Sequence, residues 1–379
     1  MKDSALYIHI PFCDHKCIYC DFYSIITSDN IDPFLNSLKK EIESYASLYS
    51  DERIFSSIFF GGGTPSLMTP GYIEDIIKSL KQNFKINDNP EITLETNPGT
   101  VDNKKLELFL AAGINRISVG IQSFDDKDLK FLTRIHDKET AVNTIFNASK
   151  AGFDNISIDL IFNLPGQTKE KWLKNLETAV KLPVNHISAY SLILERGTIL
   201  NKLVLDGKVE IQDEDYDAEL YEITIDFLSS EGFIQYEVSN FAKPGFECLH
   251  NKAYWQYRDY LSFGPSAHSF AAGKRWWNFS SLKRYITEIE KTGKAVAGFE
   301  LLNDEQKFDE YIMLAMRSGG LDIGEMKYMY KGKGQSWLND NDAYLKILFE
   351  QNLIKRDSDK ISLTKTGYAV CDEILSKLL

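Results

Sequence analysis

One structural unit recurs along the chain from residue 5 to about residue 195: a short apolar run, a loop, and then an amphipathic helical pattern. The apolar runs predict strands at residues 6–10, 54–60, 92–96, 116–121, 156–161 and 186–192. The helical patterns between them cover residues 33–48, 72–83, 103–112, 138–151 and 169–180. Strands that alternate with helices form parallel sheets with right-handed crossovers. Since no fingerprint glycines follow the first strand, the units predict an α/β fold with a partial (β/α)6 barrel, and a doubly wound sheet is the alternative.

Cys13, Cys17 and Cys20 lie in one short loop directly after the first predicted strand. This close spacing lets three thiolates converge on one metal centre. Soft thiolate ligands select zinc, copper(I) or an iron–sulfur cluster. A zinc ion would require a fourth ligand, which His15 or His9 could supply. A [4Fe–4S] cluster held by three cysteines instead keeps one iron open for a small molecule, and the ligand softness and number favour this cluster.

Polar residues and glycines follow the predicted strands at the points where the strands end. The second strand is followed by three glycines, 61–63, and the next three strands carry Glu95, Gln122 and Asp159 near their ends. Chemistry in a barrel gathers at the carboxyl ends of the strands. Glycines allow close backbone approach to a ligand, and a carboxylate can accept hydrogen bonds from ribose hydroxyls. Each residue alone is more often a turn, a cap or an ion pair, but the set predicts a ligand site.

The composition excludes several classes of protein. Lys and Arg number 43 against 55 Asp and Glu, which gives a net charge of −12 and disfavours a nucleic-acid partner. No apolar run reaches the length of a membrane span, and the first residues lack a signal-peptide core. We therefore expect a cytoplasmic protein with reduced cysteines, in which Cys371 is a small buried hydrophobic residue.

The CxxxCxxC pattern, with Tyr19 just before its last cysteine, resembles the radical S-adenosylmethionine (SAM) superfamily. The resemblance implies that the open iron of a [4Fe–4S] cluster chelates the amino and carboxylate groups of SAM. It also implies that an electron from the cluster can cleave the sulfonium to give a 5′-deoxyadenosyl radical.

The cysteine loop is followed by the motifs GGGTPS, LETNPGT, GIQSF, RIH and DLIFNLPGQT. This succession resembles the oxygen-independent coproporphyrinogen III oxidase-like family, and the resemblance extends more loosely over nearly the whole chain. It implies SAM contacts at Tyr7, Tyr19, Gly62, Gly63, Thr64, Glu95, Gln122, Arg134, Asp159 and Ile193. In the true oxidases the last four of these positions hold a second SAM.

Two features separate this chain from the true oxidases. Asp21 and Phe22 follow Cys20, where the oxidase motif continues to a fourth cysteine. The oxidases also carry a substantial segment ahead of the cluster, whereas Cys13 lies close to the first residue here. Both features resemble the sister family of HemW-type heme chaperones.

The repeat stops beyond about residue 200, and we expect three domains: 1–212 (the barrel), 213–300 (a smaller aromatic-rich α+β domain) and 301–379 (a winged-helix-like module). An acidic amphipathic helix is predicted at 213–230. Residues 236–279 are rich in aromatic side chains, for which an aromatic core is the simplest interpretation. The last module lacks a basic stripe, so we expect it to pack or to bind a partner rather than DNA.

The motif His250-Asn251-Lys252-Ala253-Tyr254-Trp255 resembles the HNxxYW signature of the HemW-type group. Imidazole is a common axial ligand of heme iron, and aromatic rings pack on porphyrin faces. We therefore expect His250 to ligate heme, with Cys248 as a second or covalent contact. A satisfied core histidine is the alternative, and His268 is a second candidate ligand.

Three functions remain open at this point. The first is a heme chaperone that carries a [4Fe–4S] cluster with exchangeable SAM and transfers heme to an unidentified acceptor protein, with a flavodoxin or ferredoxin as electron donor. The second is an oxygen-independent coproporphyrinogen III oxidase of porphyrin biosynthesis. The third is a zinc-stabilised binding protein. Phe22 and the short segment before Cys13 favour the first.

Overall fold

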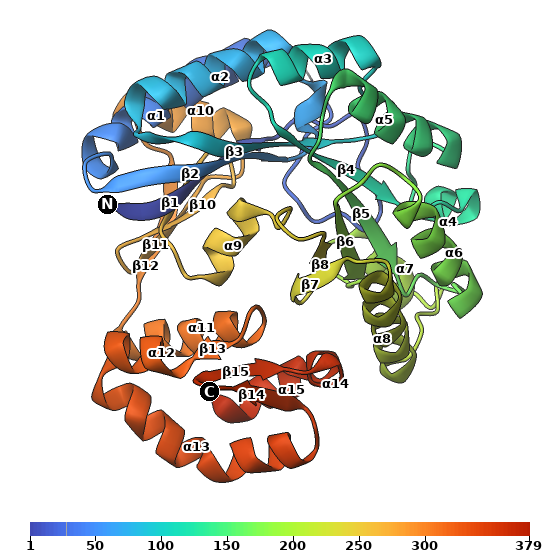
Figure 1. The fold of residues 1–379 in the computed structure, drawn as a ribbon. Coiled ribbons are helices and arrows are strands. Elements are labelled where there is room, and N and C mark those ends of the chain that lie inside the picture. Colours follow the sequence, from blue (N-terminus) through green and yellow to red (C-terminus); the bar gives the residue numbers. More distant parts are fainter. Residues whose placement is uncertain (28) are drawn as a thin grey trace.

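The computed structural model describes residues 1–27 and 29–379. Within these residues, twelve strands form one strongly curved sheet in the order β12-β11-β10-β9-β1-β2-β3-β4-β5-β6-β8-β7. Figure 1 shows this sheet as an arch with helices along its convex side and a separate C-terminal unit below its open side. The chain is therefore an α/β protein, as the sequence predicts.

The six central strands confirm the predicted repeat. They run parallel and in chain order: β1 (Lys2–Ile10), β2 (Arg53–Gly62), β3 (Ile86–Thr96), β4 (Arg116–Gln122), β5 (Ile156–Phe162) and β6 (His186–Ser191). A doubly wound sheet would reverse this order at a switch point. The barrel does not close, because β6 next pairs with an antiparallel strand. The prediction of a partial (β/α)6 barrel is confirmed.

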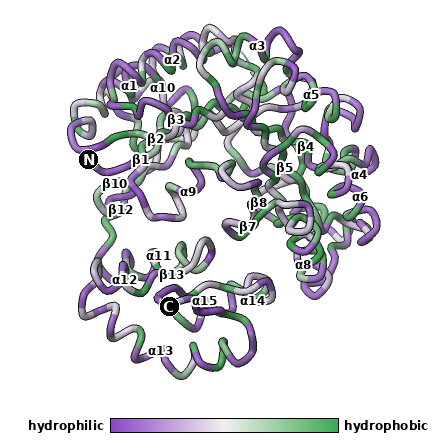
Figure 2. Tube along the Cα trace, in the orientation of Figure 1, coloured by the Kyte–Doolittle hydropathy of each residue, from purple (hydrophilic) through white to green (hydrophobic). Residues whose placement is uncertain are grey.

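Side chains on these strands alternate between two environments. Those facing the helices, such as Ile117 and Val119, are apolar and fully buried. Those between them, such as Arg116 and Ser118, face the concave side and are polar. Asp159 belongs to this inward set, where its carboxylate accepts a hydrogen bond from Ser118 Oγ at 3.2 Å. Figure 2 shows the resulting concentration of hydrophobic residues along the arch, with hydrophilic residues on the outer helices.

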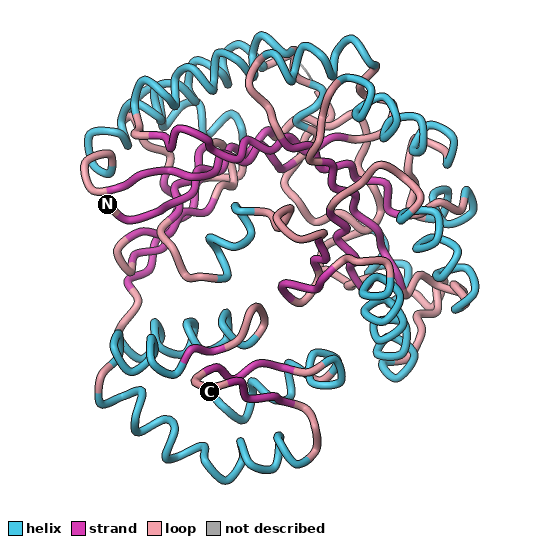
Figure 3. Tube along the Cα trace, viewed as in Figure 1, coloured by secondary structure: helices cyan, strands magenta, loops and turns pink. Residues whose placement is uncertain are grey.

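Helices connect the parallel strands across the convex side (Figure 3). They are α1 (Ile31–Tyr49), α2 (Pro70–Asn83), α3 (Asn103–Ala111), α4 (Asp126–Phe131), α5 (Lys138–Ala151) and α6 (Lys169–Val180), with a 3-10 turn, η1, at Pro65–Leu67. A further helix, α7 (Ile199–Leu205), follows the last of these parallel strands. The Thr168 hydroxyl accepts from the backbone N–H of Lys171 and so caps α6. None of the helices in the described part of the chain combines the length and the apolar character that a bilayer crossing requires.

Later segments extend both edges of the same sheet. β7 (Ile234–Glu237) and β8 (Asn240–Ala242) add to β6. On the other edge, β9 (Tyr260–Phe263) pairs in parallel with β1 and is followed by β10 (His268–Ala271), β11 (Lys274–Asn278) and β12 (Val296–Leu301). The aromatic segment therefore supplies strands to the sheet that the cysteine loop leaves.

Three helices accompany these edge strands: α8 (Glu214–Ser230), α9 (Leu249–Trp255) and α10 (Leu282–Thr292). α8 confirms the helix predicted at 213–230. α9 lies on the concave side of the arch and packs against β1 and β2 (Figure 1). Its first turn is fixed by Glu91 of β3, whose carboxylate accepts from the backbone N–H groups of Leu249 (3.0 Å) and His250 (3.2 Å).

The C-terminal unit has its own sheet and core. It comprises α11 (Asp304–Met316), β13 (Leu321–Asp322), α12 (Ile323–Tyr330), α13 (Gly332–Glu350), β14 (Ile354–Asp357), β15 (Lys360–Leu363), α14 (Lys365–Ala369) and α15 (Cys371–Leu378). The antiparallel sheet has the order β13-β15-β14, with β13 after the first helix and the other two strands after the third. Helices combined with a small antiparallel sheet are the winged-helix-like arrangement expected from the sequence. Cys371 is 5% exposed inside this core, as predicted.

Candidate functional site

The carboxyl ends of the parallel strands surround a cavity of about 350 Å³, hereafter the cluster cavity. Most residues predicted for the site line it: Cys13, Cys17, Tyr19, Cys20, Gly62, Gly63, Thr64, Glu95, Gln122, Arg134, Asp159 and Ile193. They come from the cysteine loop, from the ends of β2 to β5, from the loop after α4 and from the loop after β6. The structure thus brings residues far apart in sequence to one place.

The cysteine loop is held against the loop that follows β2. The carbonyl of Phe12 accepts from the backbone N–H of Thr64 at 2.7 Å, and the Thr64 hydroxyl lies 3.2 Å from Cys13 Sγ. A tight turn in which Cys20 N–H donates to the Cys17 carbonyl brings the other two thiols to the same cavity. All three thiols are free.

Two glycines let the loop after β2 pack closely, one on β1 and the other on the cysteine loop. Gly62 has a φ of +113°, and a Cβ there would lie 2.7 Å from the His9 ring. At Gly63 a Cβ would lie 2.5 Å from the Phe12 carbonyl oxygen, which is backbone and cannot rotate away. The glycine motif therefore serves the approach of the cysteine loop itself, in addition to any approach of a ligand.

Arg134 joins the cysteine loop to the strand ends. Its Nη1 lies 3.7 Å from Cys17 Sγ, and its Nη2 donates to Asn97 Oδ1 (2.7 Å) and to the Gly120 carbonyl (2.6 Å). Asn97 in turn donates to the Thr64 hydroxyl at 2.9 Å. The buried guanidinium therefore holds the cysteine loop, the end of β4 and the loop after β3 against one another.

Two carboxyl groups share the inner part of the cluster cavity. Burial and, to a smaller extent, the nearby Asp159 together raise the pKa of Glu95 to about 8. Burial also raises the pKa of Asp159, although Ser188, Arg116 and Ser118 oppose the shift. Glu95 Oε2 accepts from the Gly62 N–H at 3.2 Å, so one carboxyl oxygen is oriented by the glycine loop. Both groups gain a proton more readily than exposed carboxylates do.

The backbone is strained where two of these strands end. Gln122 has a φ of 72° and Asn163 a φ of 61°, a region that L-residues other than glycine rarely adopt. The strand register shifts between Gly120 and Gln122, so a bulge aims the Gln122 side chain into the cavity. Such strain persists where the surrounding structure enforces it, commonly at functional sites.

The residues present fit a [4Fe–4S] cluster with SAM. Three free thiols face one cavity rather than one point, and within the described residues no group of three His, Cys, Asp or Glu side chains converges closely enough for a single ion. Thr96 Oγ1 and Arg134 Nε are buried at this cavity without a hydrogen-bond partner in the described residues. Such atoms need a partner, which a bound ligand can supply.

Comparisons with known proteins agree with this geometry. The family model of the radical SAM superfamily matches residues 7–179. The heme chaperone HemW of Bacillus subtilis is 34% identical over 378 residues, which cover 99% of both chains. This chain belongs to the HemW family.

Two other similar proteins extend the comparison. The mitochondrial radical S-adenosyl methionine domain-containing protein 1 of Danio rerio is 40% identical over 324 residues, covering 83% of this chain and 73% of the relative. A solved structure of the coproporphyrinogen III oxidase HemN, a radical SAM enzyme of Escherichia coli, has a TM-score of 0.85. It covers 100% of this chain and 90% of that chain at 24% identity, so the likeness establishes the fold alone. Membership of the radical SAM superfamily implies a [4Fe–4S] cluster and SAM as cofactors.

His250, which the sequence suggested as a heme ligand, lies inside the barrel and is not among the residues that line the cluster cavity. His250 is 2% exposed, and its ring stacks on Phe59 at 4.9 Å. Its Nδ1 bonds to Ser57 Oγ (3.0 Å) and its Nε2 to the Tyr254 hydroxyl (2.8 Å), while burial lowers its pKa to about 3. This is the alternative considered from the sequence, a satisfied core histidine, and His250 presents no free nitrogen to a heme iron.

Cys248, the other predicted heme contact, is also fully buried. Its thiol lies 3.4 Å from Glu91 Oε1, and burial raises its pKa to about 12. A neutral thiol in this position is inert toward a ligand outside the barrel.

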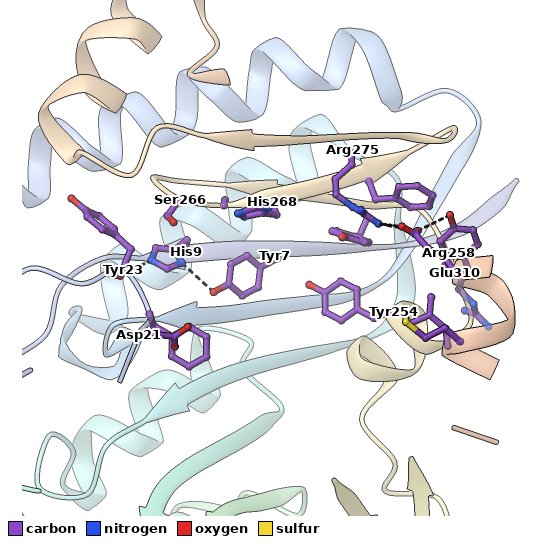
Figure 4. Close-up of a pocket in the computed structure, with 17 residues that line it drawn as sticks. Tyr7, His9, Asp21, Tyr23, Tyr254, Arg258, Ser266, His268, Arg275 and Glu310 are labelled. Atoms are coloured by element: carbon purple, nitrogen blue, oxygen red, sulfur yellow. Dashed lines mark hydrogen bonds and ion pairs between the residues drawn. The ribbon is translucent and has the colours of Figure 1, made fainter. Parts of the chain in front are cut away.

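Tyr7 lies between the cluster cavity and a second cavity of about 650 Å³, hereafter the aromatic cavity. A Cβ on Gly61 would lie 2.9 Å from the Tyr7 ring and 3.1 Å from Glu95 Oε2, so the Tyr7 ring packs directly against the glycine loop. Tyr7 lines the aromatic cavity, as do His9 and His268 (Figure 4).

Sequence reasoning missed two parts of this region. Asn97 connects Arg134 to Thr64, and its place after Glu95 at a strand end could have suggested a role. The sequence indicated the aromatic segment and His268, but not the aromatic cavity, because the cavity's residues come from β1, the cysteine loop, α9, β9 to β11 and α11. Only the folded chain brings these segments together.

Proposed function

We propose that this chain is a heme chaperone that binds heme and transfers it to an acceptor protein, and that it carries a [4Fe–4S] cluster with exchangeable SAM. The observation that carries the proposal is the convergence of three free cysteines with all the predicted SAM residues except Tyr7 on one cavity. The full-length match to a protein named as a heme chaperone supplies the function.

We assign the cluster to Cys13, Cys17 and Cys20, and the methionine part of SAM to the glycine loop at Gly62 and Gly63. The other SAM contacts are assigned to Tyr19, Thr64, Glu95, Gln122, Arg134, Asp159 and Ile193. A cluster with three protein ligands supplies an open iron for SAM and an electron for cleavage of the sulfonium.

The chain's own residues prepare this site. Arg134 contacts Cys17, and Asn97 holds Arg134 in place. Glu95 offers its free oxygen to ribose hydroxyls once its proton has left. The Tyr7 ring packs against the glycine loop and lines the aromatic cavity rather than the cluster cavity.

A cluster held by free thiols needs a reducing compartment, so we place the protein in the cytoplasm with a flavodoxin or ferredoxin as its electron donor. The heme acceptor is a further protein. The fold itself is shared with a coproporphyrinogen III oxidase, but Phe22 stands where the oxidase motif continues to a cysteine.

The proposal is tested by anaerobic reconstitution followed by two assays of the same preparation. We expect absorbance near 400 nm from the cluster, stoichiometric heme binding followed through the Soret band, and no protoporphyrinogen from coproporphyrinogen III with SAM and a reductant. Formation of protoporphyrinogen would support the oxidase instead. A colourless protein with bound zinc would overturn the cluster assignment.

A further inference from the structure

We propose that the aromatic cavity is the heme site and that His268 is the axial ligand of the heme iron. This inference rests on the proposed heme-binding function and locates it, because the sequence pointed to His250 and neither ring nitrogen of that residue is free.

The cavity has the size and lining that a flat tetrapyrrole needs. Its volume is about 650 Å³, within the range of small-molecule sites. Tyr254, Tyr257, Tyr260 and Phe270 line it and pack on one another, with Tyr254 and Tyr260 edge to face at 4.6 Å and Tyr257 stacked on Phe270 at 4.9 Å. A continuous group of aromatic side chains offers an apolar surface to a porphyrin face.

His268 differs from the other histidines near this cavity. His9 uses both nitrogens, Nδ1 toward the Tyr7 hydroxyl (3.2 Å) and Nε2 toward the Tyr23 carbonyl (2.9 Å). In the described part of the chain no hydrogen bond engages the His268 ring, which is exposed on β10 and stacks on Trp277 at 5.9 Å. Figure 4 shows the His268 ring across the cavity from Tyr7. A supported imidazole with free nitrogens is a competent iron ligand.

Charged groups lie at the far end of the cavity from His9. Arg258 pairs with Asp3, and Arg275 pairs with Glu300 (2.7 Å) and Glu310 (2.9 Å). All three pairs are partly exposed, so a heme propionate could reach the two arginines. It would share them with the carboxylates that already pair with them. Arginine is well suited to this because its planar fork binds carboxylates in two places.

The site adjoins the cluster cavity. Asp21 and Phe22, directly after Cys20, line both cavities. The position that distinguishes this chain from the oxidase motif is thus part of the wall between the two, and Phe22 is 63% exposed there. Heme bound against His268 would lie beside the cysteine loop without entering the SAM site.

The test is an anaerobic heme titration of the cluster-loaded protein, read through the Soret band. Because His268 is exposed, we expect His268→Ala to fold and to keep its cluster absorbance, but to bind heme about tenfold or more weakly. Added imidazole should restore the wild-type Soret spectrum. His268→Met should keep binding and shift the band, because the axial ligand changes. Phe299→Ala, an exposed aromatic side chain on β12 outside the cavity, is the matched control and should bind normally.

The outcomes separate the inference from the function on which it rests. If the wild-type protein binds no heme, the proposed function fails. If the wild type binds heme and His268→Ala shows the same affinity and spectrum, the inference fails and the function stands. Filling the cavity with Met313→Trp gives a second measure: unchanged heme affinity in this variant would also overturn the site.

Discussion

The cluster cavity and the aromatic cavity lie side by side but are built in different ways. The cluster cavity is formed by short motifs at the ends of neighbouring parallel strands, where the fold brings them together. The aromatic cavity is formed where β9 to β11, the helix α9 and the C-terminal unit pack beside β1 and the cysteine loop. The first is a site that the barrel itself provides, and the second exists only because later segments pack onto the barrel. Substitutions in the two cavities should therefore act independently, except at Asp21 and Phe22, which line both.

The largest expected effect is the loss of the cluster from a variant with Cys13, Cys17 and Cys20 all changed to Ala. Absorbance near 400 nm and SAM binding should disappear, because no thiolate remains to hold iron. Heme binding should persist, because the aromatic cavity keeps its residues. Cys371→Ala, in the separate C-terminal core, should keep both. Simultaneous loss of heme binding in the triple variant would show that the two cavities are one site.

Gly63→Ala should damage the cluster cavity through the backbone. The new Cβ would meet the Phe12 carbonyl oxygen at 2.5 Å, which pushes the cysteine loop away at a cost of about 2–3 kcal/mol. Denaturant unfolding and iron content would measure the two effects. Gly71→Ala is the matched control, because a Cβ there meets nothing within 4 Å. Equal stability of the two variants would contradict the tight contact.

Glu95→Gln should weaken SAM binding by about tenfold to a hundredfold, since a charge-assisted hydrogen bond is lost. It should also change the pH dependence. The Glu95 pKa is raised to about 8, so the free site is protonated below that pH, and binding a cation releases the proton. Wild-type affinity should rise as the pH approaches 8 and then level off.

The control for this prediction is the difference in the pH dependence of SAM affinity between the wild type and the Glu95→Gln variant. The amino group of SAM also titrates, so only the part of the pH dependence that Glu95→Gln removes belongs to Glu95. Calorimetry in buffers of different ionisation enthalpy would count the released protons. Identical proton release in both proteins would mean that Glu95 is already ionised.

The smallest expected effect is a gain in stability. Gln122→Gly should relieve the left-handed backbone at the end of β4 and stabilise the protein by about 0.5–1 kcal/mol, while SAM affinity falls because the side chain is gone. The same change at the exposed Gln82 in α2 should instead cost about 1 kcal/mol. Chemical denaturation would compare the free energies of unfolding of the two variants. Destabilisation of the Gln122 variant would mean that the backbone at this residue is not strained.

The sequence predicted the barrel and the cluster cavity because both depend on local patterns. Apolar runs separated by helical patterns define the six strands, and Glu95, Gln122 and Asp159 had to meet because parallel strands end on one side. The sequence motifs also indicated the family to which the chain belongs. These are properties of short segments and of one topology rule.

The features that the sequence did not predict depend on tertiary packing. The strands at 260–301 are short and follow no repeat, so nothing in the sequence indicated that they extend the edge beside β1. The motif around His250 could not show that both ring nitrogens are hydrogen-bonded, because the partner of Nδ1 is Ser57, which lies 193 positions away. His268 looked equivalent to it in sequence, and only the environment of each ring separates them.

Anomalous X-ray diffraction at the iron edge from crystals of the heme-loaded, cluster-loaded protein would test the central claim most directly. The account predicts two separate iron peaks, one at Cys13, Cys17 and Cys20 and the other at His268 between the aromatic side chains. A heme iron peak at His250, or within the cluster cavity, would contradict it.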